Sequence, residues 1–131
     1  MEAQVASGDL TPAQLAELHR LLLHAEEQSG LTFSVYLGAW NGGREGAEEL
    51  LARLPDPDRS VLVAVDPEGR SLEIVTGRLA RIPLDDHACG LAVLSMTSSF
   101  VADDLMGGLR DGLGVLADHG RRMRVFHVEQ V

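Results

Sequence analysis

The stretch of this sequence that most constrains the fold is Val61 to Val65, a run of consecutive apolar residues. A strand covered on one face alternates apolar and polar residues, whereas a strand covered on both faces is apolar throughout. The turn sequence Asp66-Pro67-Glu68-Gly69 follows the run, and residues 71–76 are typical of the returning strand of a hairpin. We therefore expect a sheet that contains a doubly covered strand and a β-hairpin.

Two helix–strand units are predicted before this hairpin. The first helix begins after Thr11, because Thr11 and Gln14 form a capping box around Pro12, and it stops at Gly30. Residues 31–40 alternate apolar and polar side chains, as a half-buried strand does. A second helix is expected at residues 44–54, and the prolines that follow these residues are expected to end it.

The second half of the chain is predicted to be helical. Asp85 and Asp86 precede an apolar stretch at residues 88–96, and the hydroxyl residues 97–99 interrupt or end that helix. Asp103 is the expected cap of a further helix that runs through about Asp118. Glycines inside this helix cost about 1 kcal/mol each relative to alanine, so we expect them to allow close approach to the sheet or to another helix. They are Gly107, Gly108, Gly112 and Gly114.

The length of 131 residues fits one domain. We expect a flexible N-terminus at residues 1–9, an α/β domain at residues 10–119 and a C-terminal tail at residues 120–131. The tail begins with basic residues and then alternates apolar and polar side chains, a pattern typical of an added edge strand or of a partner-binding segment. Its arginines either bind an acidic partner or a membrane surface, or complement a helix end. The candidate interaction residues are Arg121, Arg122, Arg124 and Phe126.

Composition excludes several classes of function. A net charge of −9 argues against nucleic-acid binding, which needs a basic surface to displace phosphate counterions. All eleven basic residues are arginine, so lysine chemistry is excluded. The single cysteine, Cys89, lies in an apolar run and is expected to be a buried structural thiol. No run is long enough for a membrane span and no signal peptide is evident, so we expect a cytoplasmic protein, free or peripheral to a membrane.

The order of the elements and several short sequences resemble a known family. Residues 30–38 resemble the first strand of an actinobacterial family of unknown function. That family is itself similar to the TPM domain, named for a thylakoid lumen phosphatase, a photosystem II repair protein and a modulator of a neuronal receptor. Residues 58–62 resemble the start of a TPM strand, and Gly77 falls where the domain has a glycine after the hairpin. Residues 100–105, followed by Gly108, resemble its late segment, so the similarity covers residues 10–119.

The resemblance implies a single-domain α/β sandwich in which helices flank a central mixed sheet. Some TPM proteins are acid phosphatases or bind divalent metal, and others act beside membrane protein complexes. On this resemblance Asp58, Asp103 and Asp104 are candidate ligands of Ca²⁺ or Mg²⁺ at the rim of the sheet. The alternative interpretation places Asp58 in a proline turn and Asp103 at a helix N-terminus.

We expect a non-enzymatic accessory module that binds a partner protein, with a membrane complex as one class of partner. This interpretation is favoured because Ala80 stands where the family has an acidic residue, and because no catalytic motif is evident. No cofactor is expected under it. The alternatives are a phosphatase that depends on Ca²⁺ or Mg²⁺, and a metal-binding domain without turnover.

Overall fold

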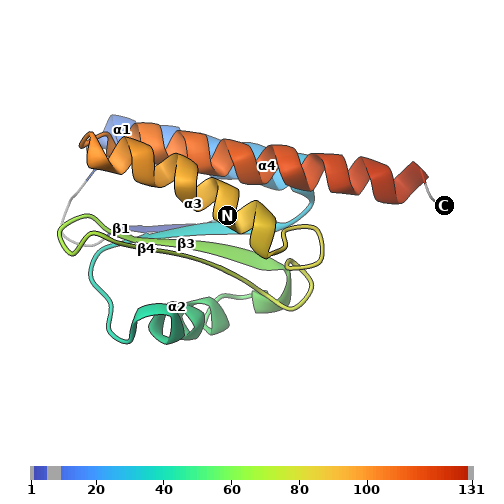
Figure 1. Ribbon diagram of the computed structural model, residues 1–131, viewed down its shortest axis with the longest axis horizontal. Coiled ribbons are helices and arrows are strands. Elements are labelled where there is room, and N and C mark those ends of the chain that lie inside the picture. Colours follow the sequence, from blue (N-terminus) through green and yellow to red (C-terminus); the bar gives the residue numbers. More distant parts are fainter. Residues whose placement is uncertain (1, 6–9, 130–131) are drawn as a thin grey trace.

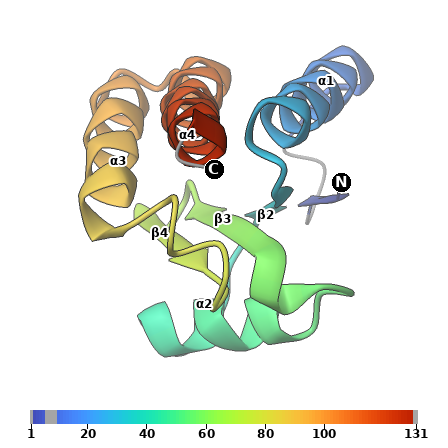
Figure 2. The ribbon, with the colours of Figure 1, turned by 90° about the vertical axis from the view of Figure 1, so that its right-hand side faces the viewer.

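Three α-helices cover one face of a mixed sheet and a fourth α-helix covers the other (Figure 1, Figure 2). The computed structural model describes residues 2–5 and 10–129, with side chains placed for residues 10–123. The elements in chain order are β1 (Glu2–Val5), α1 (Pro12–Ser29), β2 (Thr32–Leu37), α2 (Gly43–Ala52), the short 3₁₀ helix η1 (Pro57–Arg59), β3 (Ser60–Asp66), β4 (Ser71–Thr76), α3 (Asp86–Val101) and α4 (Leu105–Glu129).

The sheet has the order β1-β2-β3-β4. β1 pairs with β2 in parallel, β2 pairs with β3 in parallel, and β3 pairs with β4 in an antiparallel hairpin. The predicted fold class, a single α/β domain whose mixed sheet contains a hairpin and is flanked by helices, is confirmed. The sequence Asp66-Pro67-Glu68-Gly69 lies at the hairpin turn, as predicted.

β3 is buried on both faces, as its unbroken apolar run predicted. Val61, Val63 and Val65 point into the main core, which α1, α3 and α4 cover. The intervening Leu62 and Ala64 point the other way into a smaller core beneath α2. Alternate residues of one strand therefore join the two layers of the domain.

The ends of α1 also agree with the prediction. Thr11 and Gln14 form the capping box, with Thr11 Oγ1 accepting the N–H of Gln14 at 3.1 Å. Gly30 ends the helix in the left-handed conformation, with a φ of 77°. These caps satisfy main-chain groups that the helix itself leaves unpaired.

α4 lies between α1 and α3 (Figure 2) and contacts both. Gly108 and Gly112 make the approach to α3 possible, because a Cβ at these positions would clash with the side chains of Phe100 and Met96. The predicted role of these two glycines in close helix packing is therefore confirmed. A Cβ at Gly114 would meet nothing within 4 Å, so that glycine has no such role.

Three expectations about the ends of elements were wrong. Residues 2–5 form β1, although residues 1–9 were expected to be flexible, because their order depends on pairing with the distant β2. α3 passes through residues 97–99, since Thr97 Oγ1 and Ser98 Oγ donate to carbonyl groups one turn back in the same helix. α4 runs to Glu129, so the described part of the tail at residues 120–131 is helical and forms no edge strand.

Replacing two glycines of α4 by alanine is expected to change the stability of the protein in opposite directions. Gly112→Ala places a methyl group against the fully buried Met96, and we expect overpacking to lower the free energy of unfolding by about 1–3 kcal/mol. Gly114→Ala gains helix propensity at no steric cost, so we expect it to raise the free energy of unfolding by up to about 1 kcal/mol. Urea unfolding followed by circular dichroism measures both. Equal effects of the two substitutions would contradict the packing role of Gly112.

Candidate functional site

Asp58 lies in η1, at the start of β3, and belongs to a tight turn. Its carbonyl oxygen accepts the N–H groups of Leu79 and Ala80 at 2.8 and 3.0 Å, and its carboxylate pairs with Arg78 at 3.5 Å. Gly77 permits this arrangement, because a Cβ there would clash with the carbonyl oxygens of Pro57 and Asp58. The structure thus supplies a packing reason for the glycine after the hairpin.

Asp103 and Asp104 lie at the other end of β3. Asp104 Oδ1 accepts the N–H of Gly107 at 2.9 Å, so Asp104 caps α4 in place of the predicted Asp103. Asp103 lines a cavity together with Asp66 and Pro67, which follow the core of β3, whereas Asp58 precedes that strand. The seven residues of β3 span roughly 20 Å.

The three aspartates are therefore not brought together. Within residues 2–5 and 10–129, no group of three or more histidine, cysteine, aspartate or glutamate residues is placed to hold a metal ion. The resemblance predicted a shared rim, but Asp58 stands at the entrance of β3 and the other two stand beside its exit.

The predicted interaction residues at the C-terminal end are all in α4. Arg121 and Arg122 form ion pairs with Asp118 at 2.9 and 3.3 Å, one turn earlier in the helix. The hydrogen bond from Arg121 lowers the pKa of Asp118. This pairing agrees with the interpretation of a solvated helix end. The side chains of Arg124 and Phe126 lie outside the described residues.

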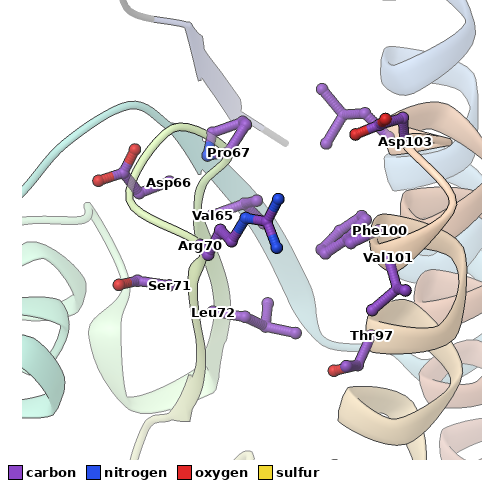
Figure 3. A pocket seen from close by; sticks show the side chains of 11 residues that line it. Val65, Asp66, Pro67, Arg70, Ser71, Leu72, Thr97, Phe100, Val101 and Asp103 are labelled. Carbon is purple, nitrogen blue, oxygen red and sulfur yellow. The ribbon is translucent and has the colours of Figure 1, made fainter.

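A cavity of about 300 Å³ opens between the β3–β4 turn and the junction of α3 with α4. Its apolar lining includes Leu72, Phe100 and Leu105. Arg70 extends from the turn toward Phe100, and Asp103 faces it from the opposite side (Figure 3). We call this cavity the Arg70 pocket. In this pocket a charged side chain lies beside an apolar surface.

Both charged residues stand in backbone conformations that favour glycine. Arg70 and Asp103 have φ values of 54° and 59°, and they are the non-glycine residues with positive φ in the described chain. Asp103 ends α3: its N–H donates to Phe100 and the next N–H donates to Ser99, a pairing that usually has glycine at this position. Arg70 directly follows Gly69, so the glycine falls one residue short of the strained position.

The outer face of α3 is exposed and carries no charge. The exposed fractions of Leu91, Leu94 and Val101 are 43%, 69% and 78%. No Asp, Glu or Arg occurs between Asp86 and Asp103 in the sequence. The hydroxyl groups on this side bond back to α3 itself, through Thr97 and Ser98. We call this surface, formed by Gly90, Leu91, Leu94, Thr97, Ser98 and Val101, the α3 face.

Sequence reasoning missed both features. The charge-free stretch was visible, but an apolar helix favours burial, and only the tertiary fold shows that one side of α3 stays uncovered. The Arg70 pocket joins residues about 30 positions apart in the chain, at 65–72 and 97–105. The order Gly69-Arg70 was the one local signal for it, because a turn normally places glycine where φ is positive.

Together the fold and this surface define a small α/β domain with an uncharged helix face beside an apolar pocket that contains an arginine. The chain belongs to the family described as Domain of unknown function (DUF5130), which matches residues 3–117. None of the helices in the described ranges is long and apolar enough to cross a membrane.

Relatives from actinobacteria share the sequence at moderate identity. Two uncharacterised proteins of Mycobacterium tuberculosis, MT2543 and Rv2468c, are each 32% identical over 108 residues, which covers 80% of this chain and 64% of theirs. The chain thus spans somewhat less than two thirds of the length of these relatives.

Solved structures share the fold at low identity. The BA42 protein of Bizionia argentinensis has a TM-score of 0.79 at 16% identity, covering 88% of this chain and 84% of its own. An N-terminal domain from P. gingivalis has a TM-score of 0.76 at 14% identity, with 89% and 80% covered. The N-terminal domain of the cg2496 protein of Corynebacterium glutamicum has a TM-score of 0.74 at 12% identity, with 88% and 77% covered.

The backbone strain at Arg70 predicts that replacing this residue by glycine stabilises the protein. The Arg70 side chain has no hydrogen bond or ion pair with any described residue, so Arg70→Gly loses no such contact and relieves the positive φ. We expect the free energy of unfolding to rise by about 1 kcal/mol, as measured by urea denaturation. Arg70→Ala is the control, since it removes the guanidinium but keeps the Cβ. A gain with alanine equal to that with glycine would contradict the role of backbone strain.

Cys89 is predicted to be chemically inert. Burial, followed by the negative charge of Asp86, raises the pKa of its thiol to about 11 from 9.0. At pH 8 the thiolate fraction is then roughly 100-fold lower than in the unfolded chain, and thiolate is the reactive form. Alkylation by iodoacetamide, followed by mass spectrometry, should be slow in buffer and fast in urea. Equal rates in both solvents would contradict this prediction.

Proposed function

We propose that this chain is a non-enzymatic accessory module whose α3 face binds an apolar helix of a partner protein within a larger assembly. The observation that carries the proposal is the exposure of that face. A chain with net charge −9 leaves large aliphatic side chains in solvent on a helix surface that has no charged residue. Exposed apolar surfaces of this kind mark interaction sites.

The spacing of the exposed residues fits a second helix. Leu91, Leu94, Ser98 and Val101 recur at intervals of three, four and three residues, which is the pattern of a helix–helix seam. Gly90 is exposed beside this seam and has open space above it, so a partner backbone can come close. Because Thr97 and Ser98 bond to their own helix, docking an apolar surface leaves no hydroxyl unsatisfied.

Charge favours a different protein over a second copy as the occupant. Two copies of this chain each carry a net charge of −9 and repel one another. The TPM resemblance supports an accessory role and favours a membrane protein complex as the partner. The separation of Asp58 from Asp103 and Asp104 gives the phosphatase alternative no comparable support.

Site-specific photocrosslinking in the source cells tests the proposal. Leu94 is replaced by benzoylphenylalanine, and the matched control carries the same replacement at Leu23, an exposed leucine of α1. We expect a discrete adduct from position 94 whose crosslinked peptide is an apolar helix of one other protein. Adding Leu91→Glu to the position-94 variant should lower the adduct yield by about tenfold or more.

Several outcomes would overturn the proposal. Equal adduct yields from positions 23 and 94 would show that the α3 face has no special affinity. An adduct with lipid, or with a second copy of this chain, would assign the face to another occupant. A lack of any adduct at position 94 would leave the face without a partner. Circular dichroism of the Leu91→Glu variant verifies that it remains folded.

A further inference from the structure

The Arg70 pocket lies at the C-terminal end of the α3 face, and Thr97 and Val101 belong to both. Its volume of about 300 Å³ is at the lower end of small-ligand sites, which suits a single residue or a group of that size. An apolar segment that lies along α3 would therefore reach the pocket at its end. The pocket can therefore select the chemical group at that end of the segment.

The Arg70 guanidinium is available to a ligand. It forms no hydrogen bond or ion pair with any described residue, and Figure 3 shows it directed into the pocket. Asp66 does not compete for it, because Asp66 Oδ1 accepts the N–H of Gly69 at 3.1 Å and the carboxylate lies on the other side of the turn (Figure 3). Asp103 faces Arg70 but no ion pair forms between them.

Two charged residues keep strained positions at this one site. The chain has 14 glycines, yet Arg70 and Asp103 occupy the left-handed positions that line the pocket. Strain of this kind persists where a side chain is needed for binding. The fork of a guanidinium matches a carboxylate, to which it donates two parallel hydrogen bonds.

We propose that the Arg70 pocket binds the C-terminal carboxylate of an apolar partner segment. Arg70 binds the carboxylate, while Leu72, Phe100 and Leu105 contact the last side chain. Asp103 repels a second negative charge, so the pocket prefers a monoanion to phosphate. This inference rests on the proposed function, because the carboxylate belongs to the C-terminal end of the segment that the α3 face binds.

A peptide titration of the whole chain tests this inference. The probe is N-acetyl-Ala-Ala-Leu with a free carboxylate, followed through backbone amide shifts of the ¹⁵N-labelled protein. We expect saturable shifts at residues 65–72 and 97–105. The same peptide with a C-terminal amide, and inorganic phosphate, should bind about tenfold or more weakly, because neither offers a single carboxylate. Equal binding of the acid and amide peptides would overturn the inference.

Variants assign the binding to Arg70. Arg70→Gly should abolish the shifts while leaving the protein folded, and Arg70→Lys should retain part of the affinity through charge alone. Arg53→Ala is the matched control: the Arg53 side chain likewise forms no hydrogen bond or ion pair with any described residue, but it lines a separate cavity of about 270 Å³ beside α2. Asp103→Asn should reduce the discrimination against phosphate. Unchanged binding by Arg70→Gly would overturn the inference.

The source of the carboxylate and the proposed function are tested separately. Octanoate is titrated in parallel; if it binds as tightly as the peptide, the ligand is a free apolar acid and the assignment to a partner terminus is wrong. If an adduct forms at position 94 but the peptide does not bind, the proposed function stands and this inference falls. If the peptide binds but no adduct forms, the partner on the α3 face is refuted and the pocket alone remains.

Discussion

The burial of β3 on both faces is the constraint on which the rest of the domain depends. Alternate side chains of β3 point into two different cores, one formed with Val61, Val63 and Val65 and the other with Leu62 and Ala64. Burial of both sets therefore requires helices on both faces of the sheet. On the α2 side, Ala47 and Leu51 are buried against the strand, and further apolar side chains pack around them: Tyr36, Trp40, Leu50 and Leu54. The opposite side is wider and takes α1, α4 and α3 in a row (Figure 2).

The position of α3 in that row explains how a helix without charge comes to face solvent. α4 occupies the middle and is buried against both neighbours, while α3 packs on α4 by one side. Gly108 and Gly112 allow α4 to pack closely on the inner side of α3. No described element packs on the outer side, where Leu91 and Leu94 are exposed. The exposure of the α3 face therefore follows from the place of α3 at the end of the row of helices (Figure 2).

The elements that could be predicted from the sequence are those defined by local patterns. The capping box at Thr11, the apolar run of β3 and the hairpin turn depend on neighbouring residues, and the structure confirms them. β1 could not be predicted, because four residues gain order only from pairing with β2. The separation of Asp58 from Asp103 and Asp104 could not be predicted for a similar reason, because it depends on which end of β3 each aspartate occupies. The Arg70 pocket likewise exists only after the β3–β4 turn and the end of α3 are placed together.

The place of α4 between α1 and α3 also bears on the order in which the chain can be assembled on the ribosome. Leu18 and Leu22 of α1 share the core with Leu109 and Leu113 of α4, which are made about 90 residues later. At ordinary rates of translation that interval lasts roughly 5–18 s. During it the nascent chain exposes the apolar side of its first helix, a surface that holding chaperones recognise, and the domain closes only when its last helix has emerged.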